Sequence, residues 1–434
     1  MDLAGEAAAL SNARPATAGS EPQVAGMVDH LFRSRAGQMV AYLTRLLGPE
    51  HLELAEEVVQ EALLKALQKW PYSGIPENPA GWLFQAARNA ALDVVRRNSV
   101  FAQKSAAIAA ELERSKSRSE PAMSTDLRDD ELRMVFMCCH PALPRDARVA
   151  LSLKTVGGFS VREVARAFLA EEPTIAQRLV RAKKQIKQLQ LSFELPRGPE
   201  LAERLDSVLE VIYLMFNEGY AAHEGEDLVR QDLCREALRL GRLVAASALG
   251  PPTAHALVAL MAFQAARLPA RTDERGDLVL LDDQDRARWD ERLVSLGFHH
   301  FTQCAAGDVI SEYHVQAAIA SVHARAKDPS ATDWKAILAL YDQLLALNPS
   351  PVVALNRAVA VSKVRGPRAA LTELEPLGTS PWMNKYYLFF SVRARLLLDA
   401  GDRAAAAESY RRALELPCSE PERRFLKRKL GECL

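Results

Sequence analysis

Apolar and polar residues recur with helical spacing in residues 159–186, in two blocks separated by a short break. Ser160 and Glu163 form a Ser-x-x-Glu capping box, which predicts that the first helix begins there. The pattern breaks at residues 169–172, and Pro173 suits the first turn of a second helix, where a missing N–H costs little. Four apolar residues of that helix are expected to face inward: Ile175, Leu179, Ala182 and Ile186.

The opposite side of the second helix carries hydrogen-bond donors and cations. A DNA recognition helix needs donors for base edges, cations for phosphates and an apolar side that holds it to a scaffold. We take Thr174, Gln177, Arg178 and Arg181 as candidate base contacts, and Lys183 and Lys184 as candidate phosphate contacts. An ordinary helical hairpin with a solvated basic face stays open as the alternative. Glu171 is a poor N-cap, so the turn departs from the usual helix-turn-helix pattern.

An earlier helix is predicted over residues 50–70, with one apolar and one acidic side. Its apolar stripe consists of Ala55, Val58, Val59, Ala62, Leu63, Ala66, Leu67 and Trp70. The polar side includes Glu57, Gln60 and Glu61. An acidic helix face repels DNA, so it is either solvated or docks to a protein.

A loop over residues 71–77, which contains Tyr72, is expected to lead into the next helix, because Asn78 followed by Pro79 suits a helix start. Trp82, Leu83, Ala86, Ala90 and Val94 are expected to form its apolar face. Arg88, Arg96 and Arg97 are expected to form a cationic edge. Aromatic side chains beside arginines can hold unstacked bases and their phosphates, although Trp82 and Phe84 also read as core residues.

The pattern predicts six segments: a disordered leader (1–23), a first helical domain (24–98), a serine-rich flexible linker (99–125), a second helical domain (126–192), a helical extension (193–311) and a repeat region (312–434). In the last segment Tyr341, Leu374 and Tyr410 are 33 and 36 residues apart, close to the roughly 34-residue tetratricopeptide unit. A generic helical bundle is the alternative. Residues 271–289 are acidic and irregular, and their spacing does not fit a calcium loop.

Composition narrows the function classes. Hydrophobic residues make up 49% and aromatic residues 6%, which favours an all-α fold of Ala- and Leu-rich helices. Lys+Arg and Asp+Glu are both 55, so any nucleic-acid surface has to be local. The six cysteines form no CxxC pair, which suits a cytoplasmic protein, and adjacent Cys138 and Cys139 are expected at a buried helix end. We predict no cofactor, metal site or membrane span, and no enzyme motif is present.

Two stretches resemble the conserved regions of bacterial sigma factors of the extracytoplasmic-function type. LAEEVVQEALLKAL with NPAGWLFQAARNAALDVVRR resembles region 2, and LKTVGGFSVREVARAFLAEEPTIAQRLVRAKKQI resembles region 4. The resemblance implies that Glu57, Gln60 and Glu61 contact the polymerase clamp. It further implies that Tyr72, Asn78, Arg88, Arg96 and Arg97 hold the melted −10 element. The region 4 helix pair would read the −35 element, next to the polymerase flap.

The C-terminal half resembles the extension of the sigma-factor group that carries tetratricopeptide repeats. The resemblance rests on YLMFNEGYAAH, DLCREALRLGRLV, LLDDQDRARWD, YHVQAAIASVHA and TDWKAILALYDQLLALNPSPVVALNRAVAV. It implies an initiation factor that binds core RNA polymerase and promoter DNA, with the extension controlling activity and its repeat face binding an unknown peptide or protein. A dimeric helix-turn-helix regulator with a repeat-based sensor, acting on duplex DNA alone, is the alternative.

Overall fold

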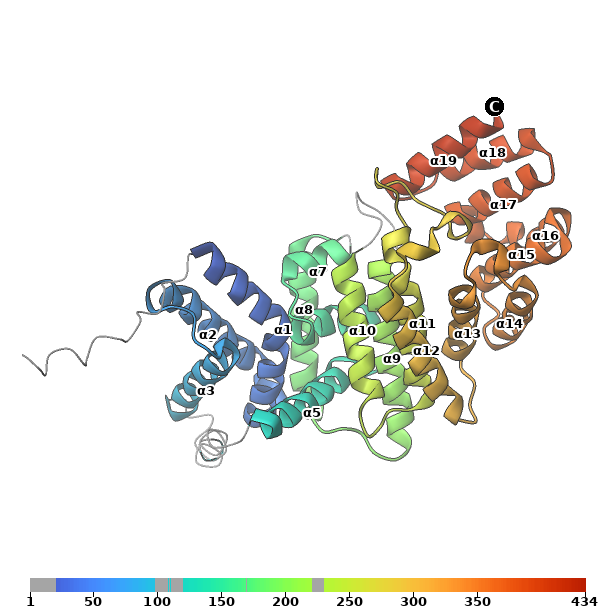
Figure 1. Ribbon diagram of the computed structural model, residues 1–434. Helices are drawn as coiled ribbons and strands as arrows, with labels where there is room; N and C mark the ends of the chain where they lie inside the picture. Colours follow the sequence, from blue (N-terminus) through green and yellow to red (C-terminus); the bar gives the residue numbers. More distant parts are fainter. Residues whose placement is uncertain (1–20, 98–107, 109, 111–119, 169, 221–229) are drawn as a thin grey trace, which may run out of the picture. The chain divides into compact units, whose positions relative to one another are not determined.

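The computed structural model describes residues 21–97, 108, 110, 120–168, 170–220 and 230–434. These residues fold into helices, with one isolated β-bridge between Thr272 and Leu278, so the predicted all-α class is confirmed (Figure 1). None of the described helices is long and apolar enough to cross a membrane. The predicted leader (1–23) and linker (99–125) lie mostly outside the described residues, but helix α1 already begins at Glu21 and α5 at Glu120.

The chain divides into two compact units. The first covers Met1–Arg166 and Ala170–Val208, and the second covers Ala167–Leu169 and Leu209–Leu434. The boundary runs through helix α9 (Pro199–Tyr220). Both predicted DNA-binding domains therefore belong to one unit, together with the first half of α9.

Three helices open the first unit: α1 (Glu21–Leu47), α2 (Leu52–Ser73) and α3 (Pro79–Arg97). They contact one another around buried Leu43, Trp70 and Leu83. The predicted end of α2 at Trp70 is wrong, because the helix continues through Pro71 to Ser73. Gly74 is its C-cap residue, with a φ of 78° that suits glycine. Pro71 is tolerated in the last turn because it removes only one helical hydrogen bond.

The rest of the unit consists of α5 (Glu120–Cys138), α6 (Arg145–Leu151), a π-helical turn (Ser152–Val156), α7 (Val161–Ala167) and α8 (Glu172–Gln188). Helix α5 packs against α1, where Arg45 Nε lies 2.9 Å from an oxygen of the buried Asp130 carboxylate. Pro144 is the N-cap residue of α6, and Asp146 lies in its first turn.

The end of α5 is buried, as predicted from Cys138 and Cys139. Burial raises the pKa of the Cys138 thiol well above its usual value, so the thiolate form is disfavoured. Carbonyl groups at this helix end accept hydrogen bonds from α9: Arg204 Nη2 donates to Phe136 O at 2.9 Å, and Ser207 Oγ donates to Cys139 O at 2.5 Å. The first half of α9 thus donates hydrogen bonds to carbonyl groups that have no partner within α5.

The second unit begins with the rest of α9 and is centred on α11 (Pro252–Ala266), which is buried on nearly all sides. It contacts α10 (Gln231–Ala245), α12 (Glu291–Gln303) and α13 (Glu312–Arg325). Helix α12 approaches α11 closely at Gly297, where a Cβ atom would lie 2.6 Å from the Phe263 ring. Residues 271–289 contain short 3-10 turns and no α-helix, in agreement with the irregular segment that the sequence predicts.

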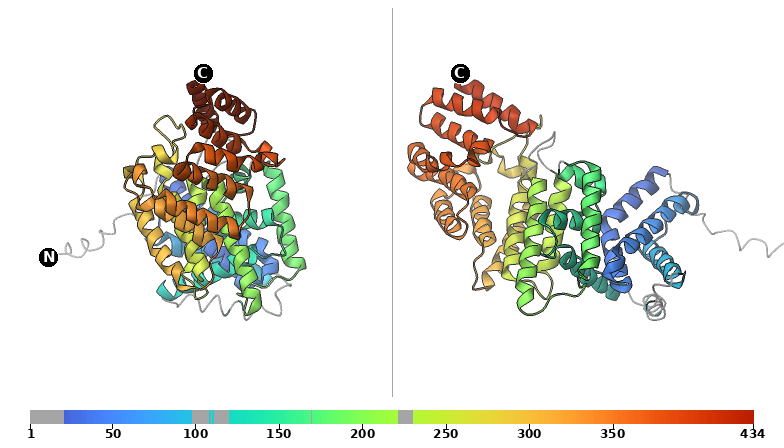
Figure 2. Two further views of the ribbon diagram at one scale, coloured as in Figure 1. Left: turned by 90° about the vertical axis from the view of Figure 1, so that its right-hand side faces the viewer. Right: turned by 180° about the vertical axis from the view of Figure 1, so that it is seen from behind.

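Six further helices follow in sequence order, each packed against the next (Figure 2). They are α14 (Trp334–Leu347), α15 (Pro351–Arg365), α16 (Pro367–Leu374), α17 (Tyr387–Asp399), α18 (Arg403–Leu414) and α19 (Glu420–Cys433). The small residues Ala370, Ala406 and Ala413 are buried in these helices. The stacked helix pairs agree with a repeat architecture, while its assignment as tetratricopeptide stays a prediction.

Two buried histidines of the second unit predict a pH dependence of its stability. Burial lowers the pKa of His300 and of His323 to about 4, with nearby His255 contributing at His300 and Arg267 and Arg286 at His323. In the unfolded chain each imidazole binds a proton near pH 6.5, so acidification from pH 6.5 to 4 favours unfolding. We expect up to about 1.4 kcal/mol of lost stability per pH unit and histidine.

The measurement is urea unfolding between pH 7 and pH 4.5 for the full chain and two variants. His323→Gln is expected to flatten the profile, whereas His299→Gln, which removes an exposed side chain and only one of several groups that lower the pKa of His300, is expected to change it less. Equal slopes for the wild type and His323→Gln would contradict the assignment.

Candidate nucleic-acid interface

Helices α7 and α8 form the predicted helix-turn-helix. The capping box at the start of α7 is confirmed: Glu163 N donates to Ser160 Oγ at 3.1 Å, and Ser160 N donates to Glu163 Oε2 at 2.8 Å. Glu171 is the N-cap residue of α8 without a side-chain hydrogen bond, as its poor capping ability suggested. The four apolar residues predicted to face inward are all buried: Ile175, Leu179, Ala182 and Ile186.

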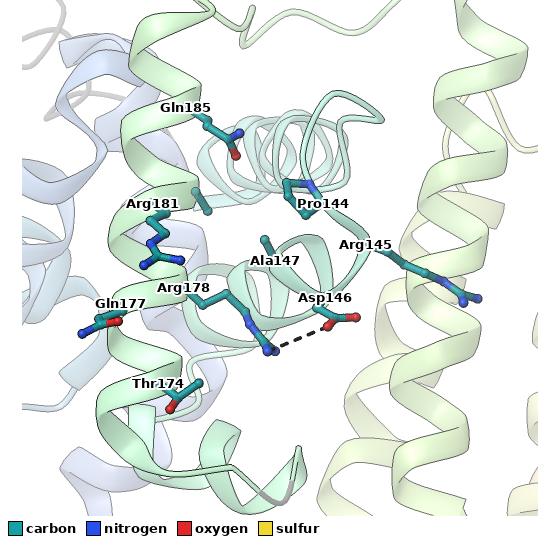
Figure 3. Close-up of a pocket in the computed structure, with 10 residues that line it drawn as sticks. Pro144, Arg145, Asp146, Ala147, Thr174, Gln177, Arg178, Arg181 and Gln185 are labelled. Atoms are coloured by element: carbon teal, nitrogen blue, oxygen red, sulfur yellow. Dashed lines mark ion pairs between the residues drawn. The ribbon is translucent and has the colours of Figure 1, made fainter.

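The opposite side of α8 faces an open cavity of about 510 Å³ between α8 and α6 (Figure 3). Thr174, Gln177 and Arg181 are exposed, and Arg178 is partly exposed. The Arg178 guanidinium points across the cavity toward Asp146 of α6, with 3.8 Å between Nη2 and Oδ2. The structure therefore brings all four candidate base contacts together on one side of a single helix.

The two candidate phosphate contacts lie in different surroundings. Lys184 is exposed on α8. Lys183 instead turns toward α2, where its Nζ lies 2.5 Å from Glu56 Oε2, and the two side chains are only 15% and 11% exposed. The Thr155 hydroxyl donates a further hydrogen bond to Glu56 Oε1 at 3.0 Å. In this arrangement the charge of Lys183 is already neutralised within the protein.

The exposed side of α2 is both acidic and apolar. Glu57, Gln60 and Glu61 are exposed, as predicted, and Glu61 pairs with Lys65 at 2.7 Å. Leu64 lies on the same side, one turn further along, and is 57% exposed. Leu67, predicted to face the core, is 39% exposed. The exposed side of α2 thus combines carboxylates, which repel DNA, with two leucines.

Tyr72 and Asn78 flank the short connection between α2 and α3. The Tyr72 side chain is 87% exposed at the end of α2. Asn78 starts α3, because its Oδ1 accepts a hydrogen bond from Gly81 N at 2.9 Å. The rings of Trp70 in α2 and Trp82 in α3 meet edge to face at 5.4 Å. The exposed phenol ring of Tyr72 suits stacking on a base.

The predicted cationic edge of α3 is only partly formed. Arg96 and Arg97 are exposed in its last turn. Arg88 is only 4% exposed, so the prediction that its guanidinium lies on the surface with them is wrong. Helix α3 contacts both α1 and α2, so a broader sector of it is buried than a single apolar stripe indicated, and Phe84 lies in that core.

Two further exposed residues of these surfaces were not predicted from the sequence. Val180 is 59% exposed on α8, three residues after Gln177 and four before Lys184. An exposed aliphatic side chain there could contact a thymine methyl group. Leu64 of α2 was missed for the same reason: each is an apolar residue out of phase with its helix stripe. No group of His, Cys, Asp or Glu in the described residues is arranged to hold a metal ion.

Models of known protein families match the residues that carry both surfaces. Residues 31–100 match the model of Sigma-70 region 2, and residues 133–186 match that of Sigma-70, region 4. The first match spans α2 and α3, and the second contains the helix-turn-helix. The chain thus contains matches to two regions of the sigma-70 family, and these two regions support a role in promoter recognition.

The C-terminal extension matches the model of a Family of unknown function (DUF6596) over residues 204–305. The chain is also similar along nearly its whole length to the "Uncharacterized protein R00370" of Rhizobium meliloti (strain 1021). The two are 40% identical over 410 residues, which is 93% of this chain and 95% of the relative. No solved structure gives a significant match.

Proposed function

We propose that this chain is an RNA polymerase sigma factor of the extracytoplasmic-function type. It binds core RNA polymerase through the exposed side of α2, holds the melted −10 element with Tyr72, Asn78, Arg96 and Arg97, and reads the −35 element with α8. The observation that carries the proposal is the pairing, in one unit, of a helix-turn-helix with an acidic and apolar docking face. A regulator that acts on duplex DNA alone does not need the second surface.

The proposal requires the two DNA-binding regions to separate. The −10 and −35 elements are about 25 base pairs apart, or about 85 Å at 3.4 Å per base pair. In the structure Lys183 of α8 contacts Glu56 of α2 at 2.5 Å, so the two regions cannot occupy both elements in this arrangement. Binding to the polymerase has to replace this ion pair, and Lys183 is then available for a phosphate.

The test combines the full chain with core RNA polymerase and a pool of promoter fragments. We expect co-purification with the polymerase and transcripts that start at a defined subset of promoters only when the chain is present. Specific binding to duplex DNA without polymerase, together with a dimeric state and no polymerase-dependent transcripts, would instead support the dimeric regulator.

Leu64→Gln is expected to weaken polymerase binding by about tenfold or more, because an apolar side chain buried at an interface centre contributes about 1–2 kcal/mol. The fold should change little, since Leu64 is already exposed. Binding is measured by titration of the labelled chain with core polymerase. Leu189→Gln is the matched control, because Leu189 is a similarly exposed leucine at the end of α8. Equal losses for both variants would argue against α2 as the docking face.

The C-terminal extension is proposed to regulate transcription in the same chain. A truncation near Leu191 would remove Arg204 and Ser207, which bind the end of α5, and would disturb the first unit itself. A chain that ends at Val208, the unit boundary, retains these contacts. We expect its promoter-directed transcription to differ from that of the full chain, and unchanged transcription would exclude regulation by the extension.

A further inference from the structure

An irregular segment of the second unit lies across the C-terminal helices. Residues 276–283, here termed the strap, come from the connection between α11 and α12, which Figure 1 draws in yellow beside α19. At one end Asp277 pairs with Arg424 at 2.6 Å and with Arg428 at 3.3 Å, both on α19. At the other end Asp282 pairs with Lys363 of α15 at 2.5 Å.

The residues between these two carboxylates are apolar. Leu278 and Leu280 pack against the hydrophobic core of helices α14–α19. The strap therefore presents leucines flanked by aspartates to a surface of apolar residues flanked by cations. Its charge and its hydrophobic pattern are both complementary to the helices beneath it.

The strap fills this surface incompletely. A cavity of about 270 Å³ lies next to Leu280 and Leu281. Its walls are formed mainly by apolar side chains of α14, α15, α17, α18 and α19, among them Trp334, Val359, Leu388, Val392 and Phe425. Because this cavity is not filled, the apolar side chains that line it lack van der Waals contacts on the side facing the strap. A ligand with larger apolar side chains would fit the groove better than the strap does.

The strap can leave the groove without unfolding the unit around it. The Lys363 and Arg424 side chains of its ion pairs are 36% and 46% exposed, and exposed pairs contribute little to stability. The connection also keeps hydrogen bonds of its own: Asp273 N donates to Asp277 O at 3.0 Å, and Val279 N donates to Arg271 O at 2.9 Å. Buried Gln284 also holds the middle of the strap, because its Nε2 donates to Val279 O at 3.2 Å, and this bond has to open when the strap leaves the groove.

We propose that the groove between α15, α17 and α19 docks a partner protein through an extended acidic segment that contains leucine-like side chains. The strap occupies the groove in the absence of this partner. Lys363 and Arg424 recognise the acidic residues of the segment, and the cavity beside Trp334 receives its apolar side chains. The inference does not depend on the proposed sigma activity.

The test uses a labelled peptide of residues 276–283 (GDLVLLDD) as the probe and the full chain as the receptor. Asp277→Asn with Asp282→Asn releases the strap, and this variant is expected to bind the peptide at least tenfold more tightly than the wild type in fluorescence anisotropy. Adding Lys363→Ala and Arg424→Ala to that variant should weaken peptide binding severalfold, because the aspartates of the peptide lose both cationic partners. Glu274→Gln, an exposed residue of the same connection, is the matched control and should bind like the wild type.

A second measurement needs no substitution. Saturating peptide is expected to speed hydrogen exchange of the strap amides in the wild-type chain, because the strap is displaced. A peptide with its three aspartates replaced by asparagine should have no effect. Equal affinity of the wild type and the released variant, peptide binding that is unchanged by loss of Lys363 and Arg424, or unchanged strap exchange would each overturn the proposal.

Discussion

Replacing both Arg178 and Arg181 by alanine is expected to lower transcription from a −35-dependent promoter by about 100-fold or more. The two side chains lie on the side of α8 that faces the open cavity, and neither is part of the buried core. An arginine that contacts a base edge contributes about 1–3 kcal/mol of discrimination, and the two losses act on the same recognition helix. The measurement is run-off transcription with core polymerase, compared between a matching and a scrambled −35 element.

Two further variants distinguish loss of base contacts by α8 from a general loss of positive charge near the DNA. Arg162→Ala removes an exposed arginine of α7 whose ion pair with Glu172 is loose at 4.0 Å, and it should change transcription less than about threefold. Asp146→Asn removes the carboxylate that Arg178 faces and is expected to raise duplex affinity, because it also removes a negative charge near the phosphates. Transcription by the double variant within about threefold of the wild type would show that α8 does not read the promoter.

The helix-turn-helix was predictable because its determinants are local. The Ser160–Glu163 box spans four residues, and the inward positions of α8 follow from helical periodicity over one short segment. The burial of Cys138 and Cys139 could be predicted for a similar reason, since prolines soon after them end the helix. Local patterns of this kind fix where a side chain points relative to its own helix.

Features that depend on distant partners could not be predicted. Arg88 lies in the periodic position of a surface residue but is buried, because α3 packs against two helices at once. Lys183 belongs to the basic side of α8, and only the approach of Glu56, 127 residues away, turns it inward. The strap pairs Asp277 with Arg424, 147 residues away, so its acidic residues looked merely solvated in the sequence.

Glu56→Lys is expected to destabilise the first unit by about 3 kcal/mol. Glu56 and Lys183 are nearly buried, and loss of one partner of a buried pair leaves an uncompensated charge that costs about 3–5 kcal/mol. The charge-swapped double variant, Glu56→Lys with Lys183→Glu, should recover about half of this loss. Recovery stays incomplete because an ammonium group at position 56 cannot accept the hydrogen bond that the Thr155 hydroxyl donates to Glu56.

Hydrogen exchange followed by mass spectrometry resolves this effect, because peptides from α2 and α8 report on the first unit separately from the second. Glu57→Lys makes the same charge change at the neighbouring exposed position and should cost less than about 0.5 kcal/mol. The pair is coupled if the charge-swapped variant is at least about 1 kcal/mol more stable than the sum of the effects of Glu56→Lys and Lys183→Glu predicts. Additive losses, or equal losses for Glu56→Lys and Glu57→Lys, would mean that the ion pair does not hold α2 and α8 together. A coupled pair would instead set the free energy that polymerase and promoter binding must supply to separate the two DNA-binding regions.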